Sequence, residues 1–103
     1  MRYYKVRYAD EFYRQLDDIR RYISERLNNP LGAERLSKEI FDTCDLLCVF
    51  PLANPIRYYG ERANFRLIHV GHYTVAFSVN EAERIVVIES VHYSRRDIES
   101  LLQ

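Results

Sequence analysis

The sequence has no tryptophan and contains only two cysteines, three glycines and three prolines among 103 residues. Such a low glycine and proline content excludes a collagen-like or low-complexity chain. Hydrophobic residues make up 48% of the sequence, which is enough to form a packed core. A chain of this length can build one core but not two. We therefore expect a single folded domain over residues 1–103.

The two cysteines, Cys44 and Cys48, are four residues apart in a stretch with helical periodicity. A helical backbone rarely brings two such thiols into disulfide geometry. The histidines at positions 69, 72 and 92 form no metal-binding spacing with them. We expect the thiols to pack as small apolar groups, and we expect no metal and no cofactor.

Net charge and long apolar runs are also missing from this chain. Fifteen basic residues balance fifteen acidic ones, so the sequence lacks the positive excess typical of broad nucleic-acid binding. No apolar run approaches the 18 residues of a membrane span, and the N-terminus leads directly into a strand-like pattern rather than a signal peptide. We expect a cytoplasmic protein that does not enter a membrane and whose contacts with any nucleic acid are local.

A strand and two amphipathic helices are predicted for the first half of the chain. Residues 2–8 alternate with the period of a strand buried on one face, and Asp10 can cap the helix that follows. The apolar stripe of that helix is formed by Phe12, Leu16, Ile19, Ile23 and Leu27. Asn29 and Pro30 favour the start of a second helix, which we expect to end near residue 50. The short connection predicts an antiparallel helical hairpin.

Strands dominate the prediction for the second half. Residues 51–63 have no period, so we expect a surface loop there. Strands are expected over 65–70, 73–79 and 84–91, and the last is apolar enough to be central and covered on both faces. Ser94 and Asp97 resemble a capping box that starts a short C-terminal helix. The predicted fold class is α+β, in the order β-α-α-β-β-β-α, with the helical hairpin packed on a small, mostly antiparallel sheet.

Several strings in this sequence resemble the RelE/ParE superfamily of bacterial toxins. Weaker ones are Tyr4-Lys5-Val6-Arg7-Tyr8 and Phe50-Pro51. The more specific one runs from Phe65-Arg66-Leu67 to Gly71-His72-Tyr73 and continues in the tail at 91–99. The resemblance is greatest to ParE-like, or plasmid-stabilisation, members. It implies a toxin of a type II toxin–antitoxin module, held in a hetero-oligomer by a cognate antitoxin.

The superfamily resemblance leaves the target open between two classes. RelE-like members cut mRNA in the ribosome, whereas ParE-like members poison DNA gyrase. RelE-like enzymes tend to place an arginine after the third-strand aromatic, where this chain has Thr74, and a second cation or histidine where it has Ser94. The absence of these phosphate-binding groups at positions 74 and 94 favours a gyrase inhibitor that acts by binding, with an mRNA endonuclease as the alternative. A degenerate, non-toxic member is a third reading.

Charge is distributed unevenly, and this directs the choice of candidate site residues. The helical hairpin, residues 10–45, has nine acidic and six basic residues, whereas basic residues gather at positions 2, 5 and 7 and at 57, 62 and 66. An RNA-cleaving site would use His92, Tyr93 and Arg95. The candidates for target binding are Arg62, Arg66, Tyr93, Arg95 and Arg96. The candidates for antitoxin binding are Tyr58, Tyr59 and Arg66.

Some of these candidates also have plain structural interpretations. Arg66 could be an ordinary solvated side chain of a strand. Arg95 and Arg96 would oppose the macrodipole of the predicted C-terminal helix, so they could instead pair with Asp97 or Glu99. The sequence alone does not choose between these interpretations.

Overall fold

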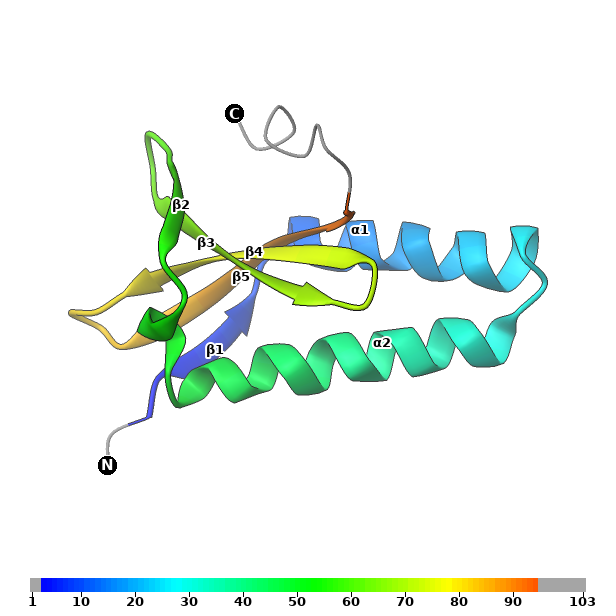
Figure 1. Cartoon of the computed structure of the whole chain (residues 1–103), viewed down its shortest axis with the longest axis horizontal. Coiled ribbons are helices and arrows are strands. Elements are labelled where there is room, and N and C mark those ends of the chain that lie inside the picture. The colour runs from blue at the N-terminus through cyan, green and yellow to red at the C-terminus, as the bar shows by residue number, and fades with distance from the viewer. Residues whose placement is uncertain (1–2, 95–103) are drawn as a thin grey trace.

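A computed structural model of the chain describes residues 3–94 and has two long helices and a five-stranded sheet (Figure 1). The helices are α1 (Asp10–Arg21), extended by a π-helical segment η1 (Tyr22–Arg26), and α2 (Pro30–Asp45), followed by short 3-10 turns η2 (Leu46–Cys48) and η3 (Pro51–Ala53). The strands are β1 (Lys5–Tyr8), β2 (Ile56–Tyr59), β3 (Asn64–Val70), β4 (Tyr73–Asn80) and β5 (Ile85–Tyr93). Their spatial order is β1-β5-β4-β3-β2, and only β1 and β5 run parallel.

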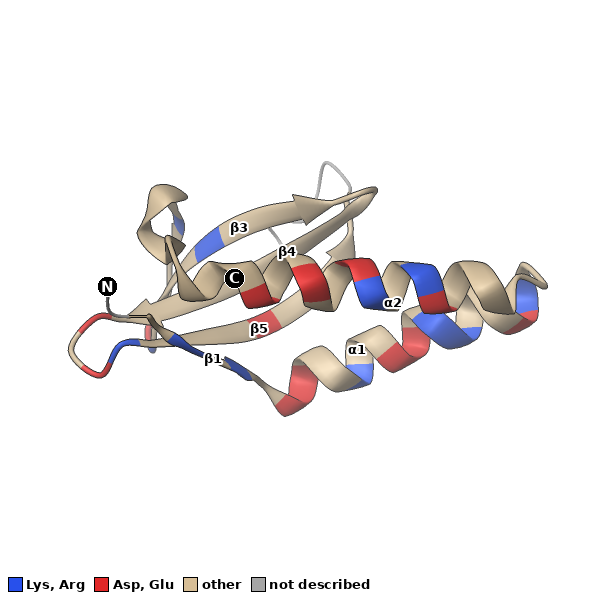
Figure 2. Ribbon diagram, turned by 90° about the horizontal axis from the view of Figure 1, so that it is seen from below, with Lys and Arg blue, Asp and Glu red and all other residues tan. Residues whose placement is uncertain are grey.

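Both helices lie against one face of the sheet, where the core forms (Figure 2). Phe12 of α1 and Ile40 of α2 are completely buried there, against Phe77 of β4 and Ile88 of β5. Phe77 and Ile88 are also cross-strand partners. Each such side chain contributes roughly 1.5–3 kcal/mol by leaving water. The strand alternation therefore places one apolar row under the helices and directs the intervening side chains to the helix-free face.

The α+β class and the mostly antiparallel sheet are confirmed, with one more strand than expected. Residues 51–63 are not only a loop, because Ile56–Tyr59 form β2 at the edge of the sheet. The strand is only four residues long and its pairing register shifts around Arg57, so it leaves no clear period in the sequence. The expected C-terminal helix lies outside the described residues.

The ends of the helices differ from expectation in three places. Ala9, not Asp10, occupies the cap position of α1, and no side chain bonds there. The second helix ends at Asp45 and continues as a 3-10 turn rather than reaching residue 50. Leu27 is 56% exposed and not part of the buried stripe. The amide of Leu27 donates to the carbonyl of Tyr22 at 3.1 Å, and this wider π-helical turn rotates the following residues off the stripe.

Of the other expectations, the cap of α2 is confirmed, whereas the expected cover on both faces of the last strand is wrong. Asn29 caps α2, because its side-chain oxygen accepts a 3.0 Å hydrogen bond from the amide of Gly32. The two cysteines are free thiols, and burial raises the pKa of Cys44 to about 12. Strand β5 is central, although the helices cover only one of its faces, and Val87 on the other face stays partly exposed. Within residues 3–94, no helix is long and apolar enough to cross a bilayer.

Candidate functional site

The helix-free face of the sheet carries a line of hydroxyl and imidazole groups, which we call the hydroxyl cluster: His69, Thr74 and Ser94. Thr74 lies on β4 opposite His69 of β3 and is only 2% exposed. The hydroxyl oxygen of Thr74 is 3.1 Å from Nδ1 of His69 and 2.7 Å from the hydroxyl oxygen of Ser94. The amide of Ser94 also donates to the carbonyl of His72 at 2.7 Å. The two hydroxyls therefore hold each other in place.

The hydroxyl cluster includes both positions singled out by the resemblance to RelE-like enzymes, which implies an arginine in place of Thr74 and a second cation or a histidine in place of Ser94. Hydroxyl groups can position a phosphate but cannot neutralise the charge that builds up during its cleavage. Here Thr74 and Ser94 also form a hydrogen bond with each other. This neutral pair cannot give a phosphate the two parallel, charge-assisted hydrogen bonds that an arginine donates.

His92 and Tyr93 are brought to different faces of the sheet. His92 pairs with Thr74 and lies beside the hydroxyl cluster, where burial lowers its pKa and favours the neutral ring. Tyr93 pairs instead with Tyr73, and their rings meet edge to face at 5.6 Å. Consecutive residues of a strand point to opposite faces, so these two candidate acid–base groups do not share one site.

A second feature, the aromatic groove, lies between the end of α1 and the ends of β4 and β5. It has a volume of about 570 Å³ and is lined by Asp18, Ile19, Tyr22, Leu27, Tyr73 and Tyr93. Tyr22, Leu27 and Tyr93 are each at least half exposed. Burial, with a smaller contribution from Tyr93, raises the pKa of Tyr73, so the groove is uncharged apart from its one aspartate. The aromatic groove could not be predicted from periodicity, because the π-helical turn that exposes Leu27 has no recognisable sequence pattern.

The arginines proposed for target binding differ in their surroundings. The guanidinium of Arg66 donates to the carbonyls of Leu52, at 3.3 Å, and Asn54, so it fastens the η3 segment to β3. Arg62 is exposed in the loop between β2 and β3. Arg95 and Arg96 lie outside the described residues. The structure therefore gives Arg66 a structural role at the junction of η3 and β3.

Tyr58 and Tyr59, the candidates for antitoxin binding, lie on the edge strand β2. Tyr58 is partly buried and pairs with Phe65 of β3. Tyr59 is 78% exposed. Both belong to the hairpin that projects from the sheet on the side away from the helices (Figure 1), and neither contributes to the aromatic groove.

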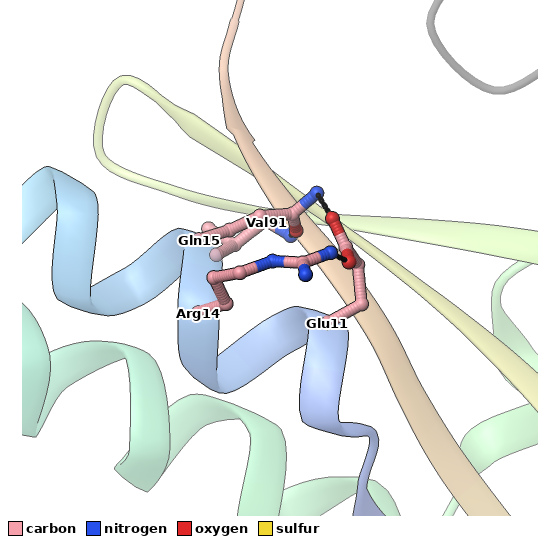
Figure 3. A network of polar contacts seen from close by, with 4 residues as sticks. All are labelled: Glu11, Arg14, Gln15 and Val91. Carbon is pink, nitrogen blue, oxygen red and sulfur yellow. Dashed lines mark hydrogen bonds and ion pairs between the residues drawn. The ribbon is translucent and has the colours of Figure 1, made fainter.

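A polar network that periodicity did not predict supports the end of β5 (Figure 3). The amide of Val91 donates to the side-chain oxygen of Gln15 on α1 at 2.8 Å. The amide nitrogen of Gln15 donates to Glu11 at 3.1 Å, and Glu11 also pairs with Arg14. Strand β1 ends at Tyr8, so it offers no hydrogen-bond acceptor to the later residues of β5. There the side chain of Gln15 on α1 accepts the hydrogen bond from the amide of Val91 instead. The network aligns the segment that carries His92 and Tyr93.

Comparisons with known proteins agree with this architecture. The family model of the "ParE toxin of type II toxin-antitoxin system, parDE" matches residues 6–98. The chain belongs to the ParE toxin family. A search of curated protein sequences gave no significant match.

Solved structures share the ParE-family fold at low sequence identity. The chromosomal ParDE system from P. aeruginosa aligns with a TM-score of 0.72 and 14% identity, over 89% of this chain and 97% of that one. The archaeal RelE–RelB complex from Pyrococcus horikoshii OT3 aligns with a TM-score of 0.65 and 14% identity, over 90% and 97%. The RelBE2 complex from Mycobacterium tuberculosis aligns with a TM-score of 0.57 and 19% identity, over 91% and 94%. At these identities the likeness shows the fold alone.

The ParE family assignment makes this chain a toxin of a type II toxin–antitoxin system. The fold and the family do not choose its target, because ParE and RelE systems both appear among the structural neighbours. The choice has to come from the residues of the site.

Proposed function

We propose that this ParE-family toxin acts by binding and inhibiting DNA gyrase rather than by cutting mRNA. The observation that carries the proposal is the 2.7 Å hydrogen bond between the hydroxyls of Thr74 and Ser94. Cleavage of RNA by its own 2′-hydroxyl needs a proton acceptor, a proton donor and cations for the phosphorane charge. In the described part of the face, a neutral pair stands at both cation positions.

The placement of His92 and Tyr93 supports the same proposal. An acid and a base must reach the same scissile phosphate, directly or through one water. Tyr93 instead packs against Tyr73 in the aromatic groove, while His92 lies opposite Thr74 on β4. These two groups are better explained as parts of two separate surfaces than as a catalytic pair.

The partner that neutralises the toxin is proposed to be a cognate antitoxin, and the aromatic groove is suited to bind one of its segments. An amphipathic helix docks by laying apolar side chains into such a groove. Tyr22, Leu27 and Tyr93 provide large exposed anchors of the type that dominates protein interfaces. The groove borders the Val91–Tyr93 segment that Gln15 supports, so its wall is held in place before a partner arrives.

An mRNA endonuclease is the second candidate, and one observation favours it. Burial lowers the pKa of His92, so the neutral imidazole beside the hydroxyl cluster could accept a proton near pH 7. In this alternative His92 would be the base, and a residue other than Thr74 and Ser94 would have to supply the cation.

The experiment that tests the proposal expresses the toxin without its antitoxin in a bacterial host. Transcript 5′ ends, plasmid supercoiling and chromosomal double-strand breaks are measured in the same culture. We expect DNA breaks and altered supercoiling with intact transcripts. New transcript ends within codons would reject the gyrase proposal in favour of mRNA cleavage, and normal growth with neither signal would indicate a degenerate toxin.

Two variants sharpen this experiment at the hydroxyl cluster. Thr74→Val removes the hydroxyl while keeping the shape of the side chain, and His92→Gln removes the imidazole that lies opposite Thr74 on β5. A binding toxin should keep its toxicity in both variants. A nuclease that uses His92 as its base should lose roughly 100-fold or more of its activity in His92→Gln, the usual contribution of general base catalysis.

A further inference from the structure

Four of the six cations on the helices form ion pairs in the described structure, all but Arg26 and Arg35, whereas Arg57 and Arg62 of the β2–β3 hairpin form none. On the helices, Arg14, Arg20, Arg21 and Lys38 each pair with a carboxylate three or four residues away. Figure 2 shows these acidic and basic residues interleaved along α1 and α2. Within residues 3–94, neither Arg57 nor Arg62 of the hairpin forms an ion pair. The hairpin therefore presents positive charge that no ion pair within the described part of the chain neutralises.

The two hairpin arginines line one cleft together with exposed aromatic surface. The cleft has a volume of about 780 Å³, and Arg57, Tyr59, Arg62 and the ring of Phe65 are among its lining residues. Tyr59 is 78% exposed, more than any other large hydrophobic side chain in the described part of the chain. Glu61 is the only carboxylate in the lining, so one negative charge stands against two positive ones.

The shape of this cleft is fixed by a close approach at Gly60. The amide of Gly60 donates to the carbonyl of Ala63 at 3.0 Å. A Cβ atom at Gly60 would lie 2.7 Å from that carbonyl oxygen and 3.1 Å from the ring of Phe65. Only glycine fits there without moving the backbone, so the hairpin holds Tyr59 and the arginines in a set arrangement.

We propose that the β2–β3 hairpin binds an unpaired nucleic-acid strand. Arg57 and Arg62 contact phosphates, and a base stacks on the exposed ring of Tyr59. Aromatic stacking combined with a basic track is the usual means of holding single strands without sequence preference. A duplex fits less well, because its bases are already stacked on one another and cannot reach a tyrosine ring. This activity goes beyond gyrase inhibition and does not depend on it.

The test measures fluorescence anisotropy of a labelled oligonucleotide titrated with the full-length toxin. The probe is about 12 thymidines long, within the site sizes of known single-strand binders, and a uridine oligonucleotide of equal length distinguishes RNA from DNA. We expect binding of at least one of the two strands. The double variant Arg57→Gln/Arg62→Gln should reduce the slope of log affinity against log salt by about 1.4, because each lost phosphate contact contributes about 0.7.

The stacking contact is tested separately at Tyr59. Tyr59→Ala should weaken binding by about 5- to 150-fold, the range that corresponds to loss of one stacked base. Tyr59→Phe keeps the ring and should restore most of the affinity. Tyr3→Ala is the matched control, because Tyr3 is also exposed, at 62%, but lies before β1 rather than in the hairpin. This control should bind as the unmodified toxin does.

Four results would overturn the inference. The first is an equal loss in the control Arg20→Gln/Arg21→Gln, which has the same charge change on α1. The second is unchanged binding in Tyr59→Ala. The third is equal affinity for a duplex of the same length, and the fourth is equal affinity for a glutamate-rich peptide of the same charge. Each of these results would show that the hairpin binds a different ligand, or that the binding comes only from nonspecific electrostatic attraction.

Discussion

The two faces of the sheet are built from the same strands but contain opposite kinds of side chain. On the helix-covered face, Val75, Phe77, Val86 and Ile88 are completely buried in the core. On the other face, the neighbouring positions of β4 are Thr74, Ala76 and Ser78, and no helix in the described chain covers them. The strand period of two separates the apolar row packed under the helices from a row of small and polar side chains on the other face.

This separation allows one face of the sheet to change while the other preserves the fold. Substitutions on the helix-free face alter charge and hydrogen bonding but leave the apolar row under the helices intact. The hydrogen-bonded hydroxyls of Thr74 and Ser94 stand where the resemblance implies an arginine and a second cation or histidine in RelE-like enzymes. Three predictions test this difference between the two faces of the sheet, in order of decreasing effect on stability.

The largest effect is expected on the covered face. Phe77→Ala should lower the free energy of unfolding by about 3–5 kcal/mol, because it leaves a cavity between the sheet and the helices. Ser78→Ala, the adjacent residue on the other face, should cost about 1 kcal/mol through its lost 2.7 Å hydrogen bond to Glu89. Urea unfolding followed by circular dichroism measures both. Equal losses would show that the two faces do not differ as proposed.

An intermediate effect is expected where α1 satisfies the edge of β5. Gln15→Ala removes the acceptor for the amide of Val91 and should cost about 1–3 kcal/mol, the usual penalty for an unsatisfied buried donor. Arg14→Ala on the same helix removes only an exposed ion pair and should cost under about 1 kcal/mol. Hydrogen exchange of the Val91 amide, read by NMR, should accelerate in the first variant alone.

The smallest effect is a pH dependence at His92. Burial lowers the pKa of His92 in the folded state below its ordinary 6.5, so the unfolded chain binds the proton more readily. The free energy of unfolding is therefore higher above pH 6.5, where His92 is neutral in both states. This extra stability is lost as the pH falls through the folded-state pKa, because protonation then favours the unfolded chain. Unfolding of the protein and of His92→Gln is compared between about pH 7 and pH 5. The variant should show the shallower loss of stability, and an equal slope would exclude His92 as the cause.

Much of the fold could be predicted from the sequence because its signals are periodic and local. The alternation from Tyr73 to Val79 gives β4 and its buried row, and Asn29-Pro30 gives the start of α2. Strand β2 was missed because four residues with a shift around Arg57 are too few to show a period. Leu27 was misplaced because a π-helical turn depends on a single backbone bond to Tyr22 and leaves no sequence signature.

The candidate site was less predictable because its geometry joins distant segments. The positions of Thr74 and Ser94 were identified from the resemblance, but their mutual hydrogen bond depends on the pairing of β4 with β5. The aromatic groove brings together Tyr22 and Tyr73, which no local pattern connects. Arg66 was a binding candidate by residue type, and only the folded loop shows that its guanidinium meets the carbonyls of Leu52 and Asn54.

The parallel pairing of β1 with β5 has a consequence for synthesis of the toxin. Lys5 pairs with Ile85, so the contact that completes the sheet joins nearly opposite ends of the chain. Such a contact closes a very long loop, which slows folding. A nascent chain folds as it emerges, and until the last strand has left the ribosome β1 has no partner. The sheet therefore cannot be completed along β1 until residues 85–88 have been translated and have folded against it.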